Sequence, residues 1–132
     1  MEFLEGIIPR EYQQKIFETC IEKNCLVDVE LSRYLPGPYT IILRKKDISF
    51  LSYVSNTDFI GIRIPACDFY ENIKKARVPF ITTSVNLSGE PFAKSIEEIP
   101  KRILEEVDIL IDEGKLNGTP SILIKEGKEI SR

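Results

Sequence analysis

The chain has 132 residues, of which 42% are hydrophobic and 30% are charged, and its formal net charge is −3. This length is enough for one hydrophobic core and too short for two ordinary domains, so we expect a single domain over residues 1–132. The chain has no histidine and its three cysteines lack the spacing of metal ligands, which argues against a His-based catalytic dyad and against a zinc site.

The composition also bears on location. No apolar run approaches the length of a membrane span, and the N-terminal residues MEFLEGIIPRE carry acids where a signal peptide carries bases. We therefore expect a cytoplasmic protein with no membrane partner, and reduced core thiols at Cys20, Cys25 and Cys67. The negative charge argues against a wholly basic surface, although residues 44–46 and 74–77 could form local patches or be ordinary solvated charge.

Hydrophobic spacing predicts helices in the first third of the chain. A helix is expected from Pro9 to Lys23, with one apolar face made by Tyr12, Ile16, Phe17, Cys20 and Ile21. A shorter helical stretch over residues 28–34 should end at the sequence Pro36-Gly37-Pro38. The β-rich run from Tyr39 to Arg44 then predicts a strand.

The segment from Phe59 to Ile64 alternates as a half-buried strand does. Its three isoleucines lie on one face, while Phe59, Gly61 and Arg63 lie on the other. Gly61 removes side-chain bulk beside Arg63, which leaves room for a carboxylate or phosphate to be held by the guanidinium fork. An exposed arginine also occurs without a ligand, so both interpretations stand.

The segment from Pro79 to Pro91, PFITTSVNLSGEP, joins a predicted strand over residues 79–83 to a polar loop. Hydroxyls, an amide and a glycine allow successive backbone N–H groups to converge on an anion, as in a phosphate site. The same residues could form an ordinary Asx or Ser turn. A helix from Cys67 to Ala76 precedes this segment.

The last third predicts a helix, a strand and a hairpin. Ser95 to Glu98 reads as a capping box that opens a helix from Ile96 to Glu106, with Pro100 as a possible kink. A strand over residues 108–112 follows. A C-terminal hairpin is then expected, with strands over residues 120–125 and 129–131 and a turn at Glu126-Gly127. Alternating helices and strands indicate one α/β (α+β) domain.

Four segments resemble, in order, motifs of the YrdC family: PGPYTIIL (36–43), GIRIP (61–65), TSVNLSG (83–89) and GTPSILI (118–124). The resemblance runs from about residue 10 to residue 132. It implies a twisted mixed sheet with helices packed on it. It also implies a truncated domain, because the family's opening strand, its Pro-Thr-Asp-Thr-x-Tyr-Gly loop and its Lys-x-Arg element do not occur in these residues.

The family makes L-threonylcarbamoyladenylate from L-threonine, bicarbonate and ATP with Mg²⁺, the first step towards threonylcarbamoyladenosine in tRNA. By resemblance, threonine is bound by Arg63, Ser84 and Ser121, and nucleotide by Asn86, Ser88, Gly89, Lys94 and Arg132. Thr40 is expected near this site, although a strand threonine needs no such role. No catalytic residue and no bound metal ligand is assigned.

Three hypotheses follow. The first is a shortened YrdC-like protein that binds nucleotide (ATP or AMP) or RNA, either tRNA or double-stranded RNA, with impaired or absent catalysis. The second is an active synthase completed by a partner chain or a homodimer that covers the missing N-terminal elements. The third is a non-catalytic interaction module that recruits a partner through an exposed sheet edge or apolar patch.

Overall fold

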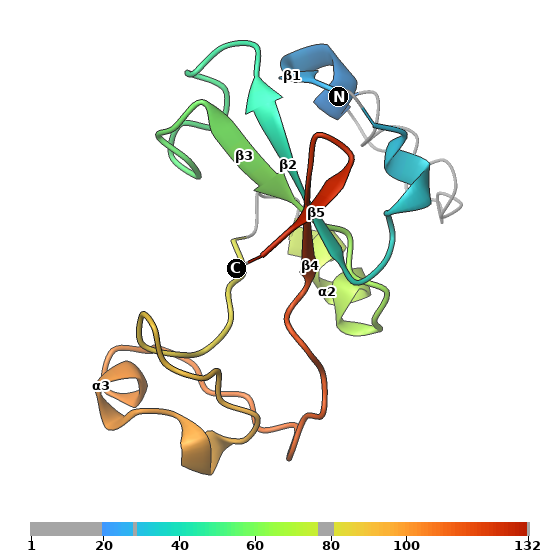
Figure 1. Cartoon of the computed structure of the whole chain (residues 1–132). Coiled ribbons are helices and arrows are strands. Elements are labelled where there is room, and N and C mark those ends of the chain that lie inside the picture. Colours follow the sequence, from blue (N-terminus) through green and yellow to red (C-terminus); the bar gives the residue numbers. More distant parts are fainter. Residues whose placement is uncertain (1–19, 28, 77–80, 132) are drawn as a thin grey trace. The chain divides into compact units, whose positions relative to one another are not determined.

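In the computed structural model (Figure 1), the structure describes residues 20–27, 29–76 and 81–131. The chain divides into two compact units. The first, which we call the sheet unit, comprises Met1–Pro79 and Ser121–Arg132, and the second, the loop unit, comprises Phe80–Pro120.

The sheet unit is built around strand β2 (Tyr39–Lys45). Strand β3 (Phe59–Ile62) pairs antiparallel along one edge of β2, and β4 (Ile122–Lys125) pairs parallel along the other. The short β1 (Cys25–Leu26) pairs antiparallel with the end of β2, and β5 (Lys128–Ile130) pairs antiparallel with β4 (Figure 1). The predicted mixed sheet and the C-terminal hairpin are therefore confirmed.

One face of this sheet carries the core. Ile41 and Leu43 of β2 are buried there, together with the alternate isoleucines of the next strand, Ile60, Ile62 and Ile64, and with Ile124 of β4. This confirms the alternation read from residues 59–64. Burying a branched aliphatic side chain is worth about 1.5–3 kcal/mol, so this face supplies the main stabilisation of the sheet.

The helical elements of the sheet unit are short. Residues 20–24 are helical, while most of the predicted helix from Pro9 to Lys23 lies outside the described residues. The predicted stretch 28–34 is a single 3₁₀ turn, η1 (Leu31–Arg33). The Gly37 N–H donates to the Ile64 carbonyl at 2.9 Å, which fixes the turn before β2. Helix α2 (Phe69–Ala76) confirms the prediction for residues 67–76 to within two residues.

In the loop unit, the predicted helix over residues 96–106 is wrong. It is broken into η2 (Ile96–Glu98) and α3 (Lys101–Leu104), on either side of Pro100. Proline has no N–H to continue the helical ladder, so the helix stops and restarts there. The capping box is also incomplete, because Ser95 makes no side-chain cap bond and Glu98 Oε2 instead accepts from the Lys94 N–H at 2.9 Å.

The predicted strand over residues 108–112 is wrong as well. None of these residues is in a strand, and Ile109 and Ile111 are 78% and 63% exposed. Residues 81–83 of the other predicted strand likewise show no strand, while residues 79 and 80 lie outside the described residues. A β-rich run becomes a strand only when another strand satisfies its backbone hydrogen bonds, and here the described chain provides none.

The cysteines divide by environment. Cys25 is buried in the core, whereas Cys20 and Cys67 are exposed, so the expected core position is correct for one thiol of the three. All three thiols are free. Burial raises the pKa of the Cys25 thiol, against the opposing charge of Lys46. No helix among the described residues has the length and apolarity needed to cross a membrane.

Candidate functional site

The sheet face opposite the core, which we call the open face, carries the candidate site. Thr40, Ile42 and Arg44 alternate along β2 with buried residues and so point away from the core. The strand register brings Gly61 opposite Ile42 and Phe59 opposite Arg44 on one side. On the other side it brings Leu123 and Lys125 of β4 beside β2. Three strands therefore share this face.

Thr40, Gly61 and Ser121 meet at one end of the open face. The Thr40 and Ser121 hydroxyl oxygens are hydrogen-bonded at 2.6 Å, although the residues are 81 positions apart in the chain. Ser121 is buried, and the neighbouring Ile122 N–H donates to the Pro38 carbonyl at 2.8 Å. A side chain at Gly61 would place its Cβ 3.3 Å from Thr40 Cγ2. At this end the open face therefore has little side-chain bulk and carries two hydroxyl groups.

Arg63 follows directly after β3. It is exposed and lies between Ile62 and Ile64, both of which are buried in the core. The alternation therefore directs its side chain to the open face, the face that also carries Gly61 and Thr40. Its guanidinium makes no ion pair or hydrogen bond with another described residue. A planar fork in this setting can hold a carboxylate through two parallel hydrogen bonds.

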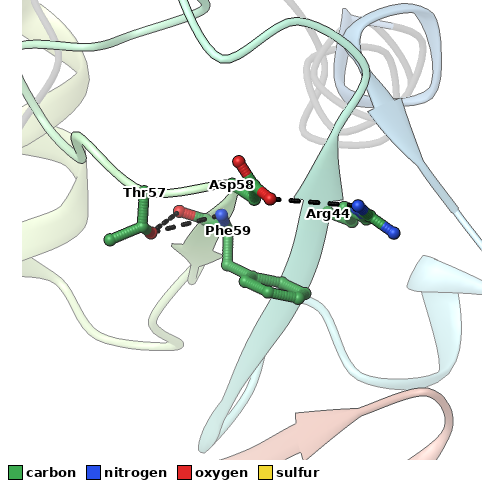
Figure 2. Close-up of polar contacts among 4 residues, drawn as sticks. All are labelled: Arg44, Thr57, Asp58 and Phe59. Atoms are coloured by element: carbon green, nitrogen blue, oxygen red, sulfur yellow. Dashed lines mark hydrogen bonds and ion pairs between the residues drawn. The ribbon is translucent and has the colours of Figure 1, made fainter.

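The basic run Arg44-Lys45-Lys46 does not form a patch. Lys45 is buried, and its ammonium donates to the Ile48 and Ser55 carbonyls at 2.8 and 2.9 Å. Lys46 donates to the Glu22 and Lys23 carbonyls at 2.6 and 3.1 Å. Of the three, Arg44 alone reaches the open face, where its guanidinium lies 3.8 Å from the Asp58 carboxylate (Figure 2). In the run of residues 74–77, only Lys75 has a described side chain.

The polar loop of the loop unit brings two predicted residues together. The Ser84 hydroxyl donates to Asn86 Oδ1 at 2.6 Å, and Asn86 Nδ2 donates to the Leu87 carbonyl at 2.9 Å. Both side chains are half-buried, while Ser88 and Gly89 are exposed. Gly89 has φ +82°, the left-handed conformation that glycine accepts without strain. The loop is therefore a hydrogen-bonded turn that still presents amide and hydroxyl groups.

The two predicted basic nucleotide contacts have different outcomes. Lys94 is exposed, and its ammonium lies 5.8 Å from the centre of the Phe92 ring. Its backbone is held at both ends, since the Lys94 carbonyl accepts from the Leu116 N–H at 2.8 Å and its N–H donates to Glu98. Arg132 lies outside the described residues. Among the described residues, no cluster of acids and cysteines has the arrangement of a metal site.

The predicted residues thus form two groups. Arg63 and Ser121 belong to the sheet unit, with Thr40 bonded to Ser121, and Ser84, Asn86, Ser88, Gly89 and Lys94 belong to the loop unit. Their roles towards threonine and nucleotide stay predictions. Sequence reasoning missed the contact between Lys125 and Phe59, whose ammonium and ring centre are 4.2 Å apart. The sequence did contain one indication that Phe59 belongs to this face, because the alternation of residues 59–64 puts it on the same side of the strand as Arg63.

Comparison with known proteins gives a family. The family model named for Sua5, YciO and YrdC, described as "Telomere recombination", matches residues 11–132. A protein of Methanocaldococcus jannaschii with the name "Putative threonylcarbamoyl-AMP synthase" is 40% identical over 103 residues, which are 77% of this chain and 48% of that protein. The threonylcarbamoyl-AMP synthase of Pseudoalteromonas atlantica is 33% identical over 87 residues, which are 65% of this chain and 46% of that protein.

A further relative has a different name. The Escherichia coli K12 protein YciO is 33% identical over 92 residues, which are 67% of this chain and 45% of that protein. The chain therefore spans about half the length of the curated relatives it matches. No solved structure matches.

Proposed function

This chain belongs to the Sua5/YciO/YrdC family, and on that premise we propose that it binds L-threonine and an adenine nucleotide, ATP with Mg²⁺ or AMP, with little or no synthase turnover by itself. The observation that carries the proposal is the open face at Arg63. There a guanidinium without an ion-pair partner among the described residues lies on the same strand face as Gly61 and the hydrogen-bonded Thr40–Ser121 pair.

The chemistry of that face suits an amino acid. The Arg63 fork binds a carboxylate in two parallel hydrogen bonds. The Thr40 hydroxyl, which is hydrogen-bonded to Ser121, has the capacity to accept a further bond from an ammonium or a hydroxyl donor. Gly61 adds no side-chain atoms beside them. L-Threonine has these three groups, a carboxylate, an ammonium and a hydroxyl, on a small frame.

The loop unit supports the nucleotide part. Ser84 and Asn86 are joined by a hydrogen bond, which fixes the amide before any ligand arrives. Asn86 uses one of its amide N–H groups on the Leu87 carbonyl, so the second N–H is left for an acceptor such as a nucleotide oxygen. The exposed Ser88 and Gly89 add a hydroxyl and backbone N–H groups beside it.

Weak turnover follows from the charge that adenylation requires. The reaction moves negative charge onto pyrophosphate, and cationic groups commonly contribute several kcal/mol to its stabilisation. In the described sheet unit, Lys45 and Lys46 donate to backbone carbonyls. Two further cations of the open face also have other contacts, since Arg44 lies against Asp58 and Lys125 lies over the Phe59 ring. Ground-state binding requires less electrostatic stabilisation than catalysis does. We therefore propose that this chain binds the ligands but turns them over weakly or not at all.

Calorimetric titration with ATP and Mg²⁺, with and without L-threonine, tests the proposal. The matched variants are Arg63→Met, Asn86→Ala and, as a control, Arg33→Met in the η1 turn. We expect saturable binding of both ligands in the wild type and in the control. Arg63→Met should weaken threonine binding by at least about tenfold, because a hydrogen bond to a charged group is worth roughly 1.5–3 kcal/mol. Asn86→Ala should weaken nucleotide binding selectively.

The same titration separates the alternatives. No heat with either ligand at millimolar concentration contradicts the proposal. Binding of duplex RNA in place of nucleotide, with an affinity that falls steeply with salt, would replace it with the double-stranded RNA hypothesis, which the cations Arg44, Arg63 and Lys125 on the open face favour. Release of pyrophosphate that depends on both threonine and bicarbonate would instead show an active synthase.

A further inference from the structure

A second feature of the open face lies at the opposite end of β2 from Thr40. It is a groove of about 350 Å³ lined by Leu26, Ile42, Arg44, Phe59, Lys125 and Glu126. Leu26 is 53% exposed, a high value for a leucine in a strand. None of the residues assigned above to threonine or nucleotide lines this groove, so it can be used independently of them.

The groove combines an apolar floor with a basic rim. Ile42 and the Phe59 ring form the floor, and the Lys125 ammonium lies 4.2 Å from the centre of that ring. Arg44 lies beside Phe59, and its ion pair with Asp58 is long, at 3.8 Å, and exposed (Figure 2). Among the residues that line the groove, Arg44 and Lys125 supply two cations against one acid, Glu126. The groove thus suits a partner that is both apolar and acidic.

The loop unit of the same chain carries a segment with this character. Residues 105–113, EEVDILIDE, contain five acids, no base and four large aliphatic side chains. All four aliphatic residues are exposed, with Ile109 at 78%. Residues 109–113 are in neither helix nor strand, so their backbone groups are not committed to a ladder. Such an exposed apolar run normally has a partner in a folded protein.

From these complementary surfaces we propose that the protein forms a symmetric homodimer in which the segment Val107–Asp112 of each copy occupies the groove of the other. Isoleucine and leucine side chains would contact Phe59, Ile42 and Leu26, while Asp108 and its acidic neighbours would face Arg44 and Lys125. A two-fold axis repeats the contact, so each dimer contains two such interfaces. Neither Arg63 nor the Thr40–Ser121 pair lines the groove, so occupation of the groove does not require a contact with them.

Charge-swapped variants test this assignment directly. Lys125→Glu places an acid against the acidic segment, and Asp108→Lys places a base against the basic groove, so each variant alone has two repulsive interfaces per dimer. In an equimolar mixture, a heterodimer brings the new acid of the first variant against the new base of the second at one interface. Its other interface keeps two wild-type surfaces. Sedimentation velocity should therefore show monomers for each variant alone and dimers for the mixture and the wild type.

Two controls make the outcome decisive. Lys101→Glu and Glu90→Lys make the same charge changes at exposed residues outside both surfaces and should leave the dimer intact. Far-ultraviolet circular dichroism checks that each variant is folded. A wild type that stays monomeric up to roughly 100 μM, a dimer that neither charge variant weakens by as much as about tenfold, or a mixture that stays monomeric overturns the proposal.

Discussion

Adjacent lysines in this chain have different surroundings. Lys45 is 5% exposed, and its ammonium is satisfied by two backbone carbonyls of the loop that follows β2. Lys46 is exposed, although it donates to two carbonyls at the end of the first helical segment. The difference arises because alternate strand residues face opposite sides and Lys45 continues the buried positions of Ile41 and Leu43.

Replacing Lys45 by methionine should therefore cost more stability than replacing Lys46. Lys45→Met leaves the Ile48 and Ser55 carbonyls without their donor inside the loop. These part-buried carbonyls would lose hydrogen bonds from a charged donor, and a hydrogen bond to a charged group is worth about 1.5–3 kcal/mol. We expect a loss of that size in urea denaturation, against less than about 1 kcal/mol for the exposed Lys46→Met. Equal losses for the two variants would contradict this account of the loop.

For individual residues, the sequence indicated which chemical groups are present but not which of them contact one another. The hydroxyls and the amide of the 83–89 loop suggested either an anion site or a turn. The structure shows Ser84 bonded to Asn86 and a turn at residues 87–90, while the anion site stays a prediction. The Thr40–Ser121 hydrogen bond joins residues 81 positions apart, and nothing in local spacing indicates such a contact. Contacts of this kind depend on which strands become neighbours.

The C-terminal hairpin shows how one turn fixes an element. Strands β4 and β5 are joined by Glu126 and Gly127, whose φ angles are +51° and +70°. Two consecutive positive φ angles are characteristic of the tight hairpin turn whose twist matches the strands. A Cβ at Gly127 would also lie 3.3 Å from Val29 Cγ1. Glycine is therefore favoured at this position by its conformation, and an added Cβ would also press on the Val29 side chain.

Gly127→Ala should destabilise the protein by about 1–2 kcal/mol, because a non-glycine residue pays that penalty in the left-handed region. Gly118 offers a matched control, since its φ is not positive and an added Cβ would contact nothing within 4 Å. Gly118→Ala should change the free energy of unfolding by no more than about 0.5 kcal/mol. Thermal or urea unfolding measures both, and a neutral Gly127→Ala would contradict the assigned turn.

Strand patterns that were clear in the sequence became strands only where the tertiary structure supplied a strand to pair with. The alternation in residues 59–64 and the hairpin became strands because β2 and β4 supply their partners. The equally β-rich residues 108–112 have no partner among the described strands and stay outside any sheet. The helix expected over residues 96–106 failed for a local reason, the missing N–H of Pro100.

For the molecule as a whole, burial is concentrated in one unit. Every residue that the structure describes as buried belongs to the sheet unit, and none of residues 81–120 is buried. A segment with few buried contacts opens locally at low free-energy cost. The loop unit is therefore held mainly by its own backbone and side-chain hydrogen bonds, such as those at Val85 and Lys94.

Amide hydrogen exchange should show this division. At a protein concentration low enough to keep the chain monomeric, amides of residues 109–118 should exchange at least about a thousandfold faster than those of β2, which is roughly 4 kcal/mol of difference in opening free energy. Mass spectrometry of peptides from the two regions measures the ratio. Uniform protection across both units would contradict the distribution of burial described here.

Motif order, local periodicity and turn chemistry were enough to predict the family, the mixed α/β class, the alternation of residues 59–64 and the C-terminal hairpin. Other features emerged only in the folded chain: which β-rich run obtained a partner, that Ser121 bonds to Thr40, that Lys45 is buried while Lys46 is not, and that Phe59 and Lys125 line a groove. These features depend on strand register and burial, which join residues far apart in the chain and so leave little signal in local spacing.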